Sequence, residues 1–274
     1  MPYPSRPPQP APPSPSSGAA SADAKRSSQS ALGQCLRDYG VITGGTLAIE
    51  HGGRLLGWSA YTHLCLAALF LLFALHRAQA SGPQGLKHHG LWLGGLLAPT
   101  ERPRSGPLGP LWDLTAALLR AIPSAFKEAS LAIVFAALTF PPFCVAFYWF
   151  HQPDHAFVFR PPTDTADYLL AQLLLVALPE EALFRGYFQT HLSDHFSSRR
   201  SLLRVPISWP ALVLQGLLFA VLHVAVTPHP ARLLVFFPGL LFGWLRAARG
   251  GIGTATVYHV LCNLLSDVLA RGFL

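Results

Sequence analysis

Long stretches without any charged residue constrain this chain more than any other feature of its sequence. Residues 129–153 and 205–231 contain no Asp, Glu, Lys or Arg, and neither do residues 59–75 and 250–266. A helix needs about 20 mostly apolar residues to cross the hydrocarbon core of a bilayer. The longer runs meet this requirement outright, so the sequence predicts membrane-spanning helices.

The composition supports the same prediction. Charged residues make up 12% of the 274 residues, about half of the ~25% that is typical of soluble domains. So few charges cannot cover the surface of a soluble protein of this size, which argues against a soluble enzyme. The net charge of +7 therefore does not indicate a nucleic-acid partner. Membrane lipid is the partner that the composition favours.

The predicted fold class is all-α, a polytopic bundle of transmembrane helices. We expect about six spans, near residues 57–76, 129–150, 166–190, 209–227, 231–248 and 252–271. Apolar residues at helical spacing over 111–126, inside a basic loop, predict an additional amphipathic helix in the membrane interface. Loops rich in Lys and Arg stay in the cytoplasm, so this loop is expected on the cytoplasmic side.

We expect three regions along the chain. Residues 1–30 are rich in Pro, Ser and Ala, cannot build a core and are expected to be disordered. Residues 31–128 would hold the first span and the basic loop with its interfacial helix, and 42–57 would form a short hairpin or a polar lead-in. Residues 129–274 would form the helical membrane core that carries the polar residues of interest.

Two adjacent acids, Glu180 and Glu181, lie at the end of an apolar run. Ionisable groups inside membrane helices are costly and usually functional, although a helix end with a surface ion pair would also carry them. At 100° per residue, Arg185 lies about 40° from Glu181 but about 140° from Glu180. We therefore expect Arg185 to pair with Glu181 and Glu180 to act as a general base. Pro179 predicts a kink or a helix start just before them.

Two further predicted helices carry polar residues. His223 lies late in one span, and His259 and Asn263 share one face of the last span because they are four residues apart. Taken separately, His223 could be a core histidine bonded to a backbone carbonyl, and the other two could join helices by hydrogen bonds. Taken together with the two acids, they would be costly in a purely structural bundle.

This set of side chains is able to hydrolyse an amide. A Glu and a His that converge on a water molecule can activate it for attack, while a second His and an Asn can donate hydrogen bonds to the developing oxyanion. This mechanism needs neither a covalent intermediate nor a cofactor. The alternative is a zinc-dependent protease with Glu180, His223 and His259 as ligands, although the sequence has no HExxH motif.

The three groups of residues resemble the signatures of the CPBP family, also called the ABI family, which includes the type II CAAX prenyl endopeptidases. Order, spacing and placement on successive apolar helices match for Glu180-Glu181-x-x-x-Arg185, Phe219-x-x-x-His223 and His259-x-x-x-Asn263. The resemblance covers about residues 166–270. It implies a glutamic-type intramembrane protease with an all-helical fold.

The resemblance also implies a role for each motif residue. Glu180 would be the base and His223 would share the water, Glu181 and Arg185 would shape the site, and His259 and Asn263 would form the oxyanion hole. Aromatic residues beside the motifs could line a cleft for substrate or could simply pack, and these are Phe184, Tyr187, Phe188 and Phe219.

The expected substrate is a protein or lipidated peptide that is cut near its C-terminus or beside the membrane. High Ala, Leu, Arg, Pro and Gly usage is typical of a GC-rich bacterial coding sequence. We therefore expect an integral protein of a bacterial inner (plasma) membrane. Two other classes stay open, a non-proteolytic binding or immunity scaffold with the same fold, and a transporter with the two acids as a proton relay. The complete set of polar residues argues against the scaffold, and the lack of internal repeats argues against the transporter.

Overall fold

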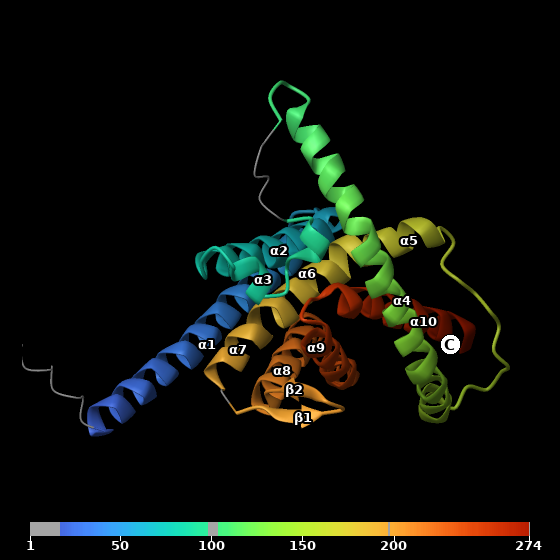
Figure 1. Cartoon of the computed structure of the whole chain (residues 1–274). Helices are drawn as coiled ribbons and strands as arrows, with labels where there is room; N and C mark the ends of the chain where they lie inside the picture. The colour runs from blue at the N-terminus through green and yellow to red at the C-terminus, as the bar shows by residue number, and fades with distance from the viewer. Residues whose placement is uncertain (1–16, 98–103, 197, 274) are drawn as a thin grey trace, which may run out of the picture.

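The computed structural model describes residues 17–97, 104–196 and 198–273. These residues are almost entirely helical (Figure 1). The one sheet among them is a two-stranded antiparallel hairpin of β1 (Arg200–Leu202) and β2 (Val205–Ile207). The predicted all-α class is confirmed.

Eight helical stretches make up the body of the described chain. The fifth of them alternates between α-helical and π-helical segments. The regular helices are α1 (Ser17–Leu55), α2 (Thr62–Ala80), α3 (Gly85–His88), α4 (Gly109–His151), α8 (Trp209–Val226), α9 (Phe236–Arg249) and α10 (Gly253–Phe273). The broken helix consists of α5 (Thr165–Ala171), η3 (Gln172–Ala177), α6 (Leu178–Glu181), η4 (Ala182–Phe188) and α7 (Gln189–His195). Short 3-10 turns are η1 (Ser59–Tyr61), η2 (Leu93–Gly95) and η5 (Pro230–Val235).

Four helical segments of the described chain are long and apolar enough to cross a membrane. They are Ser59–Ala80, Gly109–His151, Trp209–Val226 and Pro230–Arg249, and they correspond to four of the six expected spans. The other two, 166–190 and 252–271, are also helical, but they carry the charged and polar residues of the candidate site, which lower their hydropathy. The chain is an integral membrane protein.

Helix α1 differs from two predictions made for the N-terminal part of the chain. It begins at Ser17, inside the segment expected to be disordered, and it continues through 42–57, where a hairpin or polar lead-in was expected. No proline occurs between Pro15 and Pro83, so no proline breaks a helix there. Buried residues such as Ile42 fix its second half on the core. The Pro-rich residues 1–16 lie outside the described residues.

Helix α4 joins two elements that were expected to be separate. The expected interfacial helix at 111–126 and the expected span at 129–150 form one helix of 43 residues, which continues through Pro123. No glycine interrupts it between residues 110 and 151, and Ala and Leu are frequent on both sides of the expected boundary. At 1.5 Å per residue it is about 65 Å long, twice the ~30 Å hydrocarbon core. Its first half extends away from the body (Figure 1) and exposes apolar side chains such as Phe126.

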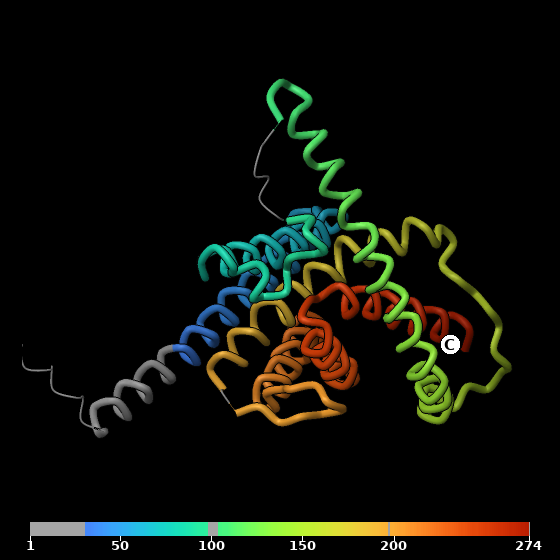
Figure 2. The backbone as a smooth tube through the Cα atoms, viewed as in Figure 1, coloured from blue at the N-terminus to red at the C-terminus, as the bar shows by residue number. Residues whose placement is uncertain are grey.

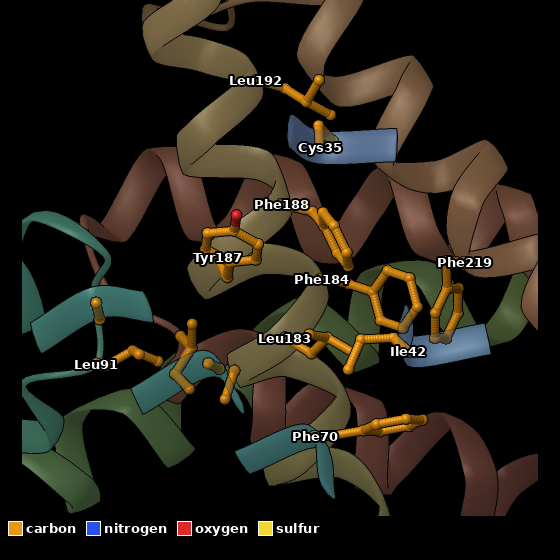
Figure 3. Packing of buried hydrophobic residues seen from close by; sticks show 14 of the residues in the cluster. Cys35, Ile42, Phe70, Leu91, Leu183, Phe184, Tyr187, Phe188, Leu192 and Phe219 are labelled. Atoms are coloured by element: carbon orange, nitrogen blue, oxygen red, sulfur yellow. The ribbon is translucent and has the colours of Figure 1, made fainter. Parts of the chain in front are cut away.

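The main core surrounds the broken helix, which runs through the body between α2 and α8 (Figure 2). Side chains of η4 and α7 pack there against residues of α1, α2 and α8. Figure 3 shows Phe184 beside Phe219, with Ile42 of α1 close to both. The rings of Phe184 and Phe219 meet edge to face, with their centroids 5.0 Å apart. This packing fixes the turn that carries the two glutamates.

Candidate active site

The two glutamates lie on a short α-helical turn, α6, between two π-helical segments. The segment η3 precedes α6 and η4 follows it. π-Helical turns are rare, are found mostly as single-turn insertions in α-helices, and occur frequently at functional sites. Pro179, in the first turn of α6, has no N–H to donate back along the helix, so the regular α-helical bonding cannot be complete there. The predicted irregularity before the glutamates is present as η3.

Glu181 and Arg185 form a fully buried ion pair. Nη1 of Arg185 donates to Oε1 of Glu181 over 3.0 Å, and both side chains have no exposed surface. Nη2 of Arg185 donates to the carbonyl oxygen of Gly239 on α9 over 3.2 Å. The guanidinium carbon lies 4.3 Å from the ring centroid of Phe219 and 5.0 Å from that of Phe242. The pairing predicted from the i,i+4 spacing is confirmed.

His259 of α10 lies between the two carboxylates. Its Nδ1 is 2.9 Å from Oε1 of Glu181, and its Nε2 is 3.8 Å from Oε2 of Glu180. The imidazole also stacks on the ring of Phe242, with a centroid distance of 4.6 Å. The same Glu181 oxygen accepts a hydrogen bond from Arg185, so we assign Nδ1 of His259 as a second donor to it. The hydrogen bond orients the ring so that Nε2 faces Glu180.

Glu180 differs from Glu181 in its access to solvent. Its side chain is 17% exposed, whereas that of Glu181 is not exposed at all. Within the described residues, Oε2 of both carboxylates has no hydrogen-bond donor, but Oε1 of Glu181 is bonded to Arg185 and His259. Glu180 is thus the acid that can accept a proton from an incoming group, because it is partly exposed and has no arginine partner.

His223 lies at the edge of the site, with the ring of Phe219 between it and His259. Nδ1 of His223 donates to the carbonyl oxygen of Phe219 over 2.9 Å, one turn earlier on α8. The Phe219 ring centroid lies 4.4 Å from that of His223 and 6.1 Å from that of His259. The described contacts do not include a hydrogen bond between His223 and Glu180. His223 therefore borders the site, and its shared role in activating water stays a prediction.

Asn263 has a partner that the motif pattern does not predict. Its Nδ2 donates to Oε1 of Gln172 on η3 over 2.8 Å. Helix α10 is thus tied to the broken helix at two points, by His259 to Glu181 and by Asn263 to Gln172. A glutamine in the otherwise apolar run 168–178 was the available signal, but the partner is 91 residues away in the sequence.

The aromatic residues expected to line a substrate cleft are core residues. Phe184, Phe188 and Phe219 are 1%, 0% and 2% exposed. They pack against α1 in the main core (Figure 3). Phe184 and Phe219 also lie against the guanidinium of Arg185. This conformation does not support a cleft-lining role for them, because burial behind the ion pair leaves no ring surface for a substrate.

A second polar cluster, which the sequence pattern also does not predict, fixes the other side of η4. Arg77 of α2 and Tyr187 both donate to Oδ2 of Asp38 on α1, and Nε of Arg77 donates to the Tyr187 oxygen over 3.3 Å. The cluster joins α1, α2 and η4. It thereby holds the helix that carries the glutamates from the face opposite Arg185.

Two glycines of α9 allow the broken helix to approach closely. The carbonyl oxygens of Gly239 and Gly243 accept hydrogen bonds from Arg185 and Gln189, which are also four residues apart. Gln215 of α8 donates to the Gly239 oxygen as well, over 3.1 Å. Small residues at this spacing let membrane helices pack backbone to backbone.

We predict that Gly243→Ala destabilises the protein by about 1–3 kcal/mol, the usual cost of overpacking a core. The added methyl would lie 2.5 Å from Leu212 Cδ1, 2.7 Å from Gln215 Nε2 and 2.9 Å from Gln189 Oε1. Thermal unfolding in detergent measures the effect. Gly44→Ala in α1 is the matched control, because a Cβ there meets nothing within 4 Å. Equal melting temperatures for the two variants would contradict the prediction.

The residues offered as zinc ligands do not form a metal site here. Among the described residues, no group of three or more His, Cys, Asp or Glu side chains is placed to hold a metal ion. Nδ1 of His259 is bonded to Glu181 and Nδ1 of His223 to its own helix, which would leave Nε2 of each ring as the nitrogen for a metal. In this conformation, however, Glu180, His223 and His259 are not gathered closely enough to hold an ion.

Comparison with known proteins agrees with the motif resemblance. Residues 162–265 match the family described as Type II CAAX prenyl endopeptidase Rce1-like, and all seven motif residues from Glu180 to Asn263 lie in the match. No curated protein and no solved structure matches the chain. The resemblance to CAAX-type proteases is thus confirmed over residues 162–265, and the matching family is one of peptide hydrolases.

Proposed function

We propose that this protein is an intramembrane endopeptidase that hydrolyses a peptide bond with a water molecule activated by Glu180. The observation that carries the proposal is one imidazole, His259, held between two carboxylates of which only one is neutralised by an arginine. Two acids with different surroundings can take different roles, and the one without a cationic partner is suited to proton transfer. The family match supports the reaction class.

In the proposed mechanism, the Glu180 carboxylate takes a proton from water as the oxygen attacks the substrate carbonyl carbon. The carbonyl oxygen becomes an oxyanion, which accepts one hydrogen bond from Nδ2 of Asn263. His259 donates the second hydrogen bond through Nε2, because its Nδ1 is bonded to Glu181. Protonated Glu180 then gives the proton to the leaving nitrogen. The C–N bond breaks, and a carboxylic acid and an amine result.

Arg185 and Glu181 act behind these groups. Arg185 pairs with the Glu181 carboxylate, and that carboxylate orients His259 through Nδ1. The fully buried position of the pair excludes water from this side of the imidazole. The role of these two residues is thus to hold His259 with Nε2 toward Glu180, a geometry that a flexible histidine would hold only part of the time.

We propose a substrate that is a membrane-associated protein, cut in its C-terminal or juxtamembrane segment, in a bacterial plasma membrane. The four apolar helices and the family match support a membrane protease acting on protein. The acidic site lies on helices that pack among the apolar ones. A scissile bond near the membrane would therefore reach it more readily than one in a distant soluble domain.

Comparative membrane proteomics tests the function. The C-terminal peptides of membrane proteins are compared between cells with the intact gene and cells in which it is deleted. We expect at least one protein to keep an uncut C-terminal segment in the deletion strain and to be cut again when the intact gene is restored. If no protein accumulates uncut, the chain is a non-proteolytic scaffold and the proposal fails.

We predict that the cleavage rate changes less than twofold in excess EDTA or 1,10-phenanthroline. Arg185 already supplies the positive charge next to Glu181, and no group of three or more His, Cys, Asp or Glu side chains among the described residues is placed to hold a metal ion. The measurement is the rate of substrate cleavage in detergent before and after dialysis against chelator. Loss of activity that is restored by added zinc would establish the zinc-dependent alternative.

A further inference from the structure

Gln172 lies outside all three motifs but contacts the site. Its Oε1 accepts a hydrogen bond from Nδ2 of Asn263 over 2.8 Å, and both side chains are partly buried. Gln172 is the first residue of η3, the π-helical segment before the glutamates. The contact joins η3 to α10, one turn beyond the bond between His259 and Glu181.

The π-helical segment explains how Gln172 comes to face α10. Gln172 and Glu181 are nine positions apart, which in an unbroken α-helix is a rotation of about 900°, so the two side chains would point to opposite sides. One inserted residue in a π-helical turn removes about 100° of this rotation. The remaining separation of about 80° lets both side chains reach the same neighbouring helix.

An oxyanion hole needs a donor with a fixed direction. A primary amide such as that of Asn263 has two N–H donors on one side and a carbonyl oxygen on the other. If the amide turned over, its oxygen would face the developing oxyanion and repel it. An acceptor bonded to one of the two hydrogens selects one orientation and directs the other hydrogen elsewhere. Oε1 of Gln172 is such an acceptor.

We propose that Gln172 is a positioning residue for the oxyanion donor Asn263. By accepting one Nδ2 hydrogen, it holds the second toward the substrate carbonyl oxygen. The inference rests on the proposed peptidase function. It adds a residue to the site that none of the three motifs contains, and it gives η3 a role, because an unbroken α-helix would point Gln172 away from α10.

The test uses the full-length protein in detergent and a peptide with the C-terminal segment found uncut in the deletion strain. Gln172→Met keeps the side-chain length and removes the acceptor. We expect kcat to fall about 10–100-fold, less than the 10²–10³-fold typical of deleting an oxyanion donor, with KM changed less than twofold. Gln172→Glu keeps an acceptor oxygen, and we expect kcat within about threefold of the original protein. Leu174→Ala, a change at an exposed position of the same segment, is the control and should leave kcat within twofold.

A double substitution separates positioning from general support of the fold. If Gln172 acts only through Asn263, Gln172→Met should have little further effect on kcat once Asn263 is replaced by alanine, so the two losses should not add. Additive losses would overturn the proposal, as would an unchanged kcat in Gln172→Met. If Gln172→Met does not fold, a Gln172→Glu variant as slow as Asn263→Ala would overturn it. Absence of cleavage by the unsubstituted protein would instead refute the peptidase function, which is a different outcome.

Discussion

Replacement of Glu180 by Gln is expected to lower the cleavage rate about 10²–10⁴-fold, the range attributed to a positioned general base. Gln is nearly isosteric with Glu but cannot take a proton from water. Glu180 is the only one of the two site acids that is partly exposed, and its Oε2 has no donor among the described residues. The measurement is the initial rate of substrate cleavage by purified protein, with melting temperature as the check on folding.

The control for this substitution is Glu50→Gln in α1. Glu50 pairs with Arg54 on the same helix, and its side chain is 16% exposed, close to the 17% of Glu180, whereas its partner Arg54 is 62% exposed. Such surface pairs contribute little, so the rate should change less than twofold. Normal processing by Glu180→Gln, in protein that melts like the original, would rule out Glu180 as the base. The Asn263 and Gln172 variants would then have to be interpreted with a different base.

The parts of the site that depend on local geometry were predictable from the sequence. Glu181 and Arg185 are four residues apart on one helix, so their pairing follows from helix rotation alone, and the structure has it. The long apolar runs likewise predicted the helical fold, because length and apolar composition are sufficient to indicate a spanning helix.

The contacts between distant segments were not predictable in the same way. Gln172 meets Asn263 only because a π-helical turn rotates the Gln172 side chain toward the helix face that carries Glu181. An α-helical projection of 100° per residue places it on the opposite face. Asp38 and Arg77 meet Tyr187 across three separate segments. Of the two roles left open for Phe184, Phe188 and Phe219, this conformation favours packing over a substrate cleft, and aromatic character alone does not distinguish a cleft from a core.

Loss of Arg185 is expected to destabilise the protein more than any of the other substitutions. In Arg185→Met, the buried carboxylate of Glu181 keeps its charge without a cation, and breaking a buried pair in this way typically costs about 3–5 kcal/mol. Met would fill much of the space between Phe219 and Phe242. The Gly239 oxygen would keep its hydrogen bond from Gln215. The destabilisation would therefore come mainly from the unpaired charge.

The double variant Glu181→Gln with Arg185→Met separates charge from packing. Removing both charges leaves an acceptor for Nδ1 of His259, so we expect the melting temperature to recover most of the loss. Arg54→Met, at an exposed pair, should cost less than about 1 kcal/mol. Cleavage by the double variant should stay well below that of the original protein, because a neutral amide at position 181 holds His259 less firmly than a carboxylate. A single Arg185→Met variant as stable as the original would show that Glu181 carries no charge. The different surroundings of Glu180 and Glu181 would then no longer support Glu180 as the base.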